Sequence, residues 1–135
     1  IGAFLDDGYS REEVKLAWET SRILGQDVPV NATCVRVPVF HGHAMVLHVE
    51  TGETLGLDKA ADLLGKEPAV SLMLDDVATP ATDVVGEDSV LVSRLRQDSS
   101  HEKGIDLWLV ADNIRKGAAL NCIQIAEILI KEYLN

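Results

Sequence analysis

The chain has 135 residues and a mass of 14.7 kDa, which suits one domain and excludes two complete enzyme domains. Hydrophobic residues make up 47% and charged residues 25%, a balance that predicts a buried core rather than disorder. The formal net charge of −10 argues against binding to nucleic acid or anionic lipid, and no apolar run is long enough for a membrane span. With only two cysteines and no secretory signal, we expect a reducing, cytoplasmic location. Because the sequence opens at Ile1 without an initiator Met, we expect either a trimmed chain or a piece of a longer polypeptide.

The first part of the chain predicts a helix and then a strand. After a turn at residues 6–9, Ser10 and Glu13 match the capping-box pattern, in which each side chain satisfies the other residue's backbone N–H. Apolar and small residues follow at helical spacing, and Gly25 is a suitable C-terminal stop. The alternating valines of residues 34–40 then predict a strand, which Pro38 would interrupt or confine to a sheet edge.

The remaining elements predict an α+β fold. In chain order they are a strand at 46–50, a helix at 57–64, a strand at 69–74, strands at 90–96 and 105–110 joined by a long hairpin loop, and a helix at 118–134. Strands and helices do not alternate strictly, which argues against a doubly wound sheet. We therefore expect a mixed, largely antiparallel sheet covered by helices. The last helix is apolar on several faces, so either this domain covers it completely or it packs on something that the chain lacks.

Arg36 lies inside the predicted apolar strand, where an unpaired guanidinium would be costly. Its planar fork suits bidentate binding of a carboxylate, but spacing alone favours an internal ion pair with one of the 22 acidic residues. Glu13 is expected first of all to close the helix cap. Lys15, taken alone, is typical of a solvated surface residue.

Two histidines flank Gly42. His43 could act as a general acid or base, because its ordinary pKa lies near working pH, although a structural histidine is the simpler interpretation. His41 and His43 could instead bind a metal with help from His48 or Glu50, but no third ligand has motif spacing.

Residues 111–119 form a second candidate. Asp112 or Asn113 can cap the following helix, and Arg115 and Lys116 would favour an anion at its N-terminus. An ordinary helix start with small packing residues is the plainer interpretation. Phosphate-loop, G-x-S-x-G and H-E-x-x-H motifs are absent from the sequence.

Two blocks together resemble one family. V-R-V-P-V-F-x-G-H spans residues 35–43, and A-D-N-x-R-K-G-A-A-L-N spans residues 111–121. With E-E-V-K at residues 12–15 and the strand around residues 94–96, these blocks resemble the second half of aspartate-β-semialdehyde dehydrogenases from end to end. The resemblance implies a glyceraldehyde-3-phosphate-dehydrogenase-like fold. It also implies NADP-dependent, reversible reductive dephosphorylation of L-aspartyl-β-phosphate through a cysteine thioester, in lysine (diaminopimelate), methionine and threonine biosynthesis.

The same resemblance implies roles for matching residues. His43 would be the acid/base partner of the nucleophilic cysteine, and Arg36 would hold the substrate α-carboxylate. Glu13 would hold the α-ammonium group, Lys15 the phosphate, and Asn113 would lie beside the cofactor. Residues 1–112 would form the catalytic and dimerisation domain of a homodimer or dimer of dimers. Residues 113–135 would pack on the absent NADP-binding domain.

Departures from the family pattern matter as well. The glycine-rich nucleotide-binding half and the nucleophilic cysteine are missing, because neither Cys34 nor Cys122 has the expected Asn-Cys setting. Ala44 stands where many relatives have Ser. We therefore expect the 135 residues alone to be inactive. The alternatives are a catalytically incomplete paralogue, an isolated dimerisation domain, or a metal-binding module.

The two main candidates also impose a geometric condition. Along a straight strand Arg36 and His43 would be about 23 Å apart and on opposite faces. Both can serve one small substrate only if the chain bends. We therefore predict a bend or bulge between Pro38 and His43, with Gly42 as the pivot.

Overall fold

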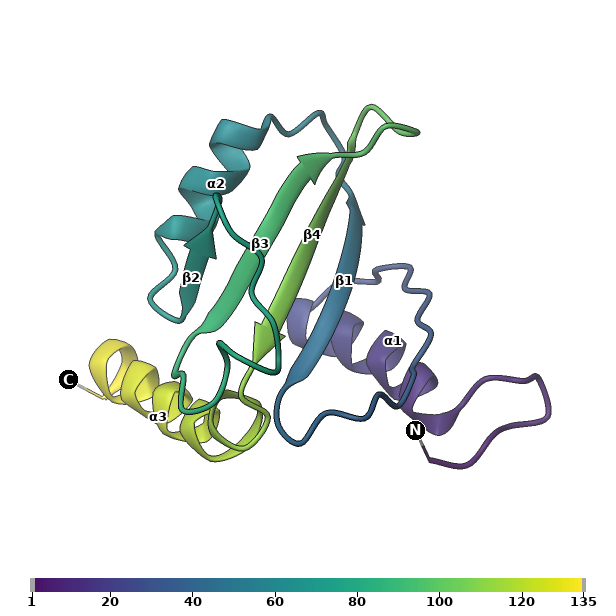
Figure 1. Cartoon of the computed structure of the whole chain (residues 1–135), viewed down its shortest axis with the longest axis horizontal. Coiled ribbons are helices and arrows are strands. Elements are labelled where there is room, and N and C mark those ends of the chain that lie inside the picture. The colour runs from purple at the N-terminus through teal and green to yellow at the C-terminus, as the bar shows by residue number, and fades with distance from the viewer. Residues whose placement is uncertain (1, 135) are drawn as a thin grey trace. The chain divides into compact units, whose positions relative to one another are not determined.

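The computed structural model describes residues 2–134, which divide into two compact units at the boundary between Pro38 and Val39. The first unit contains α1 (Arg11–Leu24), and the second contains the strands, α2 (Leu57–Gly65), η1 (Arg115–Ala119) and α3 (Leu120–Tyr133), as labelled in part in Figure 1. Within residues 2–134, none of the helices has the length and apolar character needed to cross a bilayer.

The first unit is built around α1, which spans Arg11–Leu24. The predicted capping box is present: the Ser10 hydroxyl accepts from Glu13 N at 3.3 Å, and the Glu13 carboxylate accepts from Ser10 N at 2.7 Å. Gly25 ends the helix in the left-handed conformation, with φ of 66°. The predicted start and stop of this helix are therefore confirmed.

The predicted strand at residues 34–40 is wrong. The backbone from residue 31 to residue 39 has no regular secondary structure, and the boundary between the two units falls after Pro38. The side chains of Val35, Val37 and Phe40 are 74%, 51% and 100% exposed. A strand needs a partner for its N–H and C=O groups, and within residues 2–134 none pairs with this segment.

The second unit contains a four-stranded mixed sheet in the order β1-β4-β3-β2. The strands are β1 (His43–Glu50), β2 (Val70–Met73), β3 (Val90–Gln97) and β4 (Gly104–Ala111). β4 pairs antiparallel with both β1 and β3, and β2 pairs parallel with β3. The predicted α+β class, with a mixed and largely antiparallel sheet, is confirmed.

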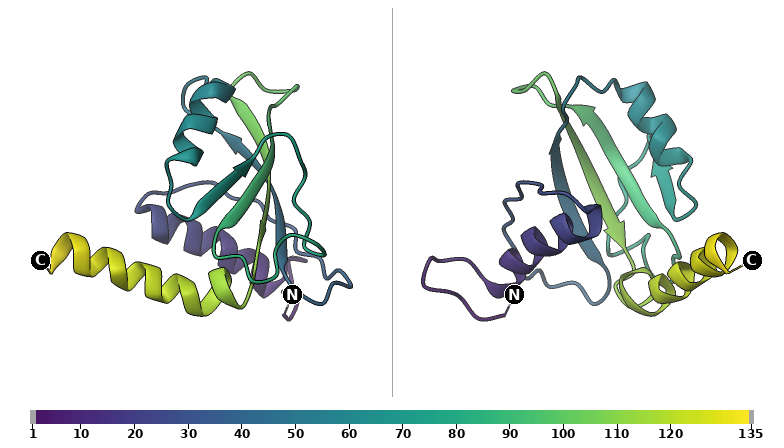
Figure 2. Two further views of the ribbon diagram at one scale, coloured as in Figure 1. Left: turned by 60° about the vertical axis from the view of Figure 1, so that its left-hand side comes forward. Right: turned by 180° about the vertical axis from the view of Figure 1, so that it is seen from behind.

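Each face of the sheet has its own buried cluster. The helix α2 (Leu57–Gly65) covers one face, where Ala60 packs with Val92 and Leu107 (Figure 2). Because side chains alternate along a strand, Leu91 on β3 and Val110 on β4 point to the other face. There they pack under the loop at residues 75–89, which contains turns but no helix or strand.

The C-terminal region begins with a π-helical turn, η1 (Arg115–Ala119), and continues as α3 (Leu120–Tyr133). The predicted helix is therefore present, with a wider first turn. α3 contains no buried residue, and Ile125, Ile128 and Ile130 are each about half exposed. Figure 1 shows α3 extending from the end of β4 beyond the sheet. The described part of the chain therefore does not cover the apolar faces of this helix.

Candidate active site

The five candidate residues divide between the two units. Glu13, Lys15 and Arg36 belong to the first, and His43 and Asn113 belong to the second. The two residues of the second unit are brought together, although 70 positions separate them in the sequence. His43 is the first residue of β1 and pairs with Ala111 at the end of β4, two residues before Asn113.

The predicted bend before His43 is confirmed. The backbone bends at Phe40 and His41, and Gly42 has φ of 89°, a left-handed conformation that strongly favours glycine. β1 begins directly after this pivot. The His43 side chain is exposed, so its imidazole is accessible at the end of the sheet.

Asn113 holds the backbone of the bend. Its side-chain Oδ1 accepts a hydrogen bond from Gly42 N at 3.0 Å. No sequence pattern indicates this contact, because it depends on the register between β1 and β4. Asn113 itself is exposed and follows the buried Asp112.

Asp112 fixes the start of the C-terminal region. Its Oδ1 accepts from the backbone N–H groups of Ile114 and Arg115 at 2.8 and 2.9 Å, and its Oδ2 accepts from Gly86 N at 3.0 Å. These donors, with Arg115 N first, hold the pKa of the Asp112 carboxyl below its ordinary value. Of the two predicted caps, Asp112 therefore caps the helix start, whereas Asn113 turns toward Gly42.

The carboxylate of Glu13 is engaged at both oxygens. Oε2 closes the helix cap, and Oε1 accepts from Cys34 N at 2.7 Å, which ties the irregular segment at residues 31–39 to α1. The side chain is 9% exposed. The Cys34 hydrogen bond and then the Ser10 hydrogen bonds lower the pKa of Glu13, so it is ionised at neutral pH.

The two cations of the first unit have different surroundings. Lys15 is exposed and lies 3.9 Å from Glu19 one helical turn away, an arrangement typical of a solvated surface pair. Arg36 is exposed and forms no salt bridge with any residue in the range 2–134. The predicted internal ion pair of Arg36 is therefore wrong, because the segment that carries it is not a buried strand.

Cys34 lacks the properties of an activated nucleophile. Cys34 is half-buried, and its desolvation, followed by the nearby charge of Glu13, raises its thiol pKa. Cys122 is exposed on α3. A thiolate nucleophile is favoured by cations or helix N-termini, and Cys34 faces the opposite influence.

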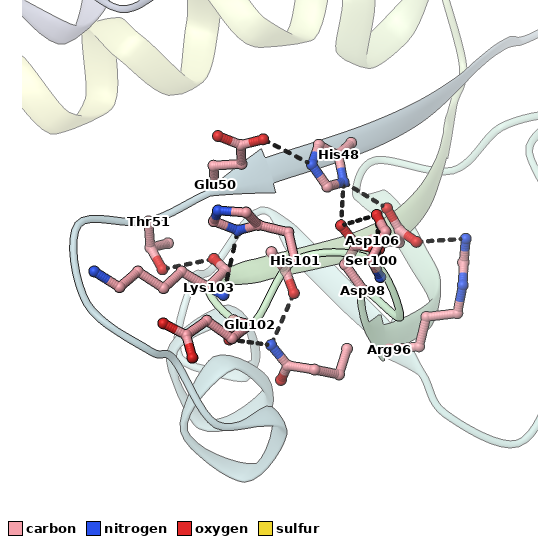
Figure 3. A network of polar contacts seen from close by, with 12 residues as sticks. His48, Glu50, Thr51, Arg96, Asp98, Ser100, His101, Glu102, Lys103 and Asp106 are labelled. Carbon is pink, nitrogen blue, oxygen red and sulfur yellow. Dashed lines mark hydrogen bonds and ion pairs between the residues drawn. The ribbon is translucent and has the colours of Figure 1, made fainter.

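A polar network joins three strands at the other end of the sheet (Figure 3). His48 Nδ1 of β1 lies 3.0 Å from Asp106 Oδ1 of β4, and the second Asp106 oxygen lies 2.8 Å from Arg96 Nη2 of β3. Asp98 and Glu50 lie 3.7 and 3.5 Å from the imidazole nitrogens. The Asp106 hydrogen bond is the main cause of a raised His48 pKa. Across residues 2–134, no three histidine, cysteine or acidic side chains are grouped so that they could hold a metal ion.

Comparison with known proteins places this chain in a family. A family profile described as "Semialdehyde dehydrogenase, dimerisation domain" matches residues 1–116. The chain belongs to this family. Together with the relatives described next, this match confirms the resemblance to aspartate-β-semialdehyde dehydrogenases that the two sequence blocks indicate.

Relatives named as aspartate-semialdehyde dehydrogenases match nearly the whole chain. It is 50% identical over 139 residues to "Aspartate-semialdehyde dehydrogenase" of Legionella pneumophila, and 48% identical over 135 residues to "Aspartate-semialdehyde dehydrogenase 2" of Vibrio cholerae. These matches cover 99% and 98% of the chain but 40% of each relative. The chain therefore spans about two fifths of the length of these proteins.

Solved structures agree with the sequence comparison. The crystal structure of aspartate semialdehyde dehydrogenase II from Vibrio cholerae, complexed with ASA, matches with a TM-score of 0.92 at 48% identity. A probable aspartate-semialdehyde dehydrogenase from Pseudomonas aeruginosa matches with a TM-score of 0.89 at 32% identity. Both matches cover 98% of this chain and 40% of the other.

Proposed function

We propose that this chain is the catalytic and dimerisation part of an NADP-dependent aspartate-β-semialdehyde dehydrogenase. The full-length enzyme would convert L-aspartyl-β-phosphate reversibly to L-aspartate-β-semialdehyde and phosphate, in lysine, methionine and threonine biosynthesis. The observation that carries this proposal is the bend at Gly42, which presents an exposed His43 in a chain 48–50% identical to such dehydrogenases. Because the chain spans two fifths of these relatives, it would be inactive alone.

His43 would act as the general acid and base. A cysteine thiolate outside this chain would attack the acyl carbon, phosphate would leave, and the resulting thioester would accept hydride. His43 would take the thiol proton before the attack and return it when the thiolate leaves. A histidine imidazole can both accept and donate a proton, and the exposed His43 is accessible for both steps.

Arg36 and Lys15 would bind the anionic groups of the substrate. The Arg36 guanidinium has no carboxylate partner within residues 2–134, so its planar fork is open to the substrate α-carboxylate. Within the described residues, the salt bridge of Lys15 is a long contact of 3.9 Å to Glu19, and its ammonium would be the counter-charge for phosphate. Both assignments follow from the matching family positions.

Glu13 would have two roles. By family position it would contact the substrate α-ammonium group with lone pairs that its two backbone hydrogen bonds leave open. Its bond to Cys34 N also shapes the segment that carries Arg36 two residues further on. The structural role rests on the hydrogen bonds above, and the ammonium contact rests on the resemblance.

The cofactor would be bound mainly by residues outside this chain. Asn113 fits a peripheral contact, since its side chain is exposed and its Nδ2 has no acceptor within the described residues. Its two N–H groups could donate to a carboxamide or phosphate oxygen. When bound, NADPH supplies the hydride.

The proposed enzyme has a matching organisation. Residues 1–112 would form the catalytic and dimerisation domain of a homodimer or a dimer of dimers in the cytoplasm. Residues 113–135 would pack on the NADP-binding domain, which would cover the apolar faces of α3 that are exposed here.

The proposal is tested with the full-length protein that carries this chain. We expect NADPH formation from L-aspartate-β-semialdehyde, phosphate and NADP, followed by absorbance, and no formation when phosphate is omitted. Arg36→Lys should raise the KM for the semialdehyde by about tenfold or more, because lysine cannot form the bidentate contact. A full-length protein without this phosphate-dependent activity would instead be the catalytically incomplete paralogue.

A further inference from the structure

Gly42 is held on its apolar side by close packing. A Cβ added to this residue would lie 2.7 Å from Val84 Cγ1 and 3.1 Å from Pro80 Cβ. The loop at residues 75–89 therefore presses directly on the backbone that precedes His43. Because Val84 and Pro80 meet Gly42 with apolar side-chain atoms, this packing provides no hydrogen-bond acceptor for the Gly42 N–H.

Asn113 supplies the missing restraint on the polar side. Its Oδ1 accepts from Gly42 N at 3.0 Å, across a sequence separation of 71 residues. This N–H belongs to the peptide group immediately before the Gly42 Cα and lies one residue from the His43 Cα. A contact at this place limits the rotation of Gly42 and so limits the directions in which the His43 side chain can leave the backbone.

Asn113 is itself on a rigid support. β1 and β4 pair in register up to His43 and Ala111, and Asp112 accepts three backbone hydrogen bonds with its carboxylate. One of these donors is Gly86 N, in the same loop that presses on Gly42. The loop that packs on Gly42 and the segment that carries Asn113 are therefore connected through the buried carboxylate of Asp112.

The two ends of the Asn113 amide have different partners. Oδ1 is used by Gly42, whereas Nδ2 has no acceptor within the described residues. An aspartate at this position would keep an acceptor for Gly42 N and would lose both donors. The two functions of the amide can therefore be separated by substitution.

We propose that Asn113 is a positioning residue, which sets the direction of the His43 imidazole by holding Gly42 N. The inference rests on the proposed function, because it requires His43 to be the acid/base. It differs from a cofactor contact, which would use Nδ2 and affect cofactor binding. It also differs from simple packing, which would not depend on a hydrogen-bond acceptor.

The first test measures amide hydrogen exchange at Gly42 in the full-length protein. Asn113→Ala should speed the exchange of this amide by roughly tenfold, and Asn113→Asp should restore slow exchange. Asn31→Ala, which removes an exposed amide in the other unit, is the matched control and should leave Gly42 unchanged. If Asn113→Ala fails to fold, Asn113→Leu, which is similar in size and has no hydrogen-bond acceptor, gives the same comparison.

The second test separates kcat from KM in the same variants. Asn113→Ala should lower kcat by about tenfold or more, whereas Asn113→Asp should recover most of this loss and raise the KM for the cofactor. Equal losses of kcat in both variants, or unchanged Gly42 exchange in Asn113→Ala, would overturn the positioning role while wild-type activity still supported the proposed function. An inactive wild type would overturn the proposed function and the positioning role together.

Discussion

The carboxylate of Glu13 serves two segments of the chain at once. It closes the N-terminus of α1 and holds Cys34 N in the segment that carries Arg36. Two backbone donors favour the ionised form, which explains the lowered pKa. A single buried acid thus links the helix to a stretch without secondary structure.

Glu13→Gln should lower the thermal midpoint by several degrees. The amide has one acceptor oxygen in place of two, so one backbone N–H loses its partner and an NH₂ group faces it. Thermal unfolding followed by circular dichroism measures the change. Glu12→Gln is the matched control, since this neighbour is exposed, and it should shift the midpoint little. Equal shifts in the two variants would contradict the role given to Glu13.

Gly42 is the second residue whose identity the structure requires. Gly42→Ala combines a left-handed φ of 89° with contacts that are too short, and should destabilise the protein by about 1–3 kcal/mol. Urea unfolding measures the difference. Gly52→Ala is the control, because nothing lies within 4 Å of its added Cβ and its φ is not left-handed. An unchanged free energy of unfolding in Gly42→Ala would contradict this expectation and would show that the loop at residues 75–89 moves to accommodate the added Cβ.

Among the elements, the sequence correctly predicted those features that are determined by residues close together in the chain. Ser10, Glu13 and Gly25 fixed both ends of α1, and glycine at the bend indicated the pivot before β1. The strand predicted at residues 34–40 failed because alternation says which faces side chains prefer, not whether a partner strand exists. The Gly42–Asn113 contact could not be predicted from the sequence either, because it depends on the register between β1 and β4.

The network around His48 is the element-scale feature that responds to pH. Asp106 and, more weakly, Glu50 and Asp98 raise the His48 pKa above its ordinary value of about 6.5. A raised folded-state pKa gives stability that is complete below pH 6.5 and is lost as pH rises through the folded value.

His48→Gln should remove that part of the pH dependence. Thermal midpoints measured from pH 5.5 to pH 8.5 should fall with rising pH more steeply in the wild type than in the variant. His101→Gln is a suitable control, since His101 contributes no hydrogen bond to His48 or Asp106. Parallel profiles for the wild type and His48→Gln would show that the imidazole does not link β1 to β4 through its charge.

At the scale of the whole molecule, the described residues leave much of the apolar surface of α3 uncovered. Its isoleucines on several faces are about half exposed, and none of its residues is buried. The sequence predicted two outcomes for such a helix, and the structure excludes coverage by residues 2–134. The packing proposed above, on an NADP-binding domain outside this chain, would give these faces a partner.

Ile128→Glu should therefore act differently in two contexts. In the 135-residue chain it should leave the thermal midpoint nearly unchanged, because Ile128 is 52% exposed. In the full-length protein it should lower the midpoint by several degrees, because a carboxylate would be buried against the other domain. Glu127→Gln is the neighbouring control. A full-length protein that tolerates Ile128→Glu would place another face of α3, or none, in the contact.

The acid/base role of His43 is tested most directly by the kcat of the full-length His43→Ala protein. We expect kcat to fall by about 10²-fold or more, because removal of a general acid/base has this effect, with the fold unchanged by circular dichroism. His41→Ala, which removes an exposed imidazole two residues earlier, should keep kcat within a few-fold of the wild type. Near-normal turnover in His43→Ala would contradict the account.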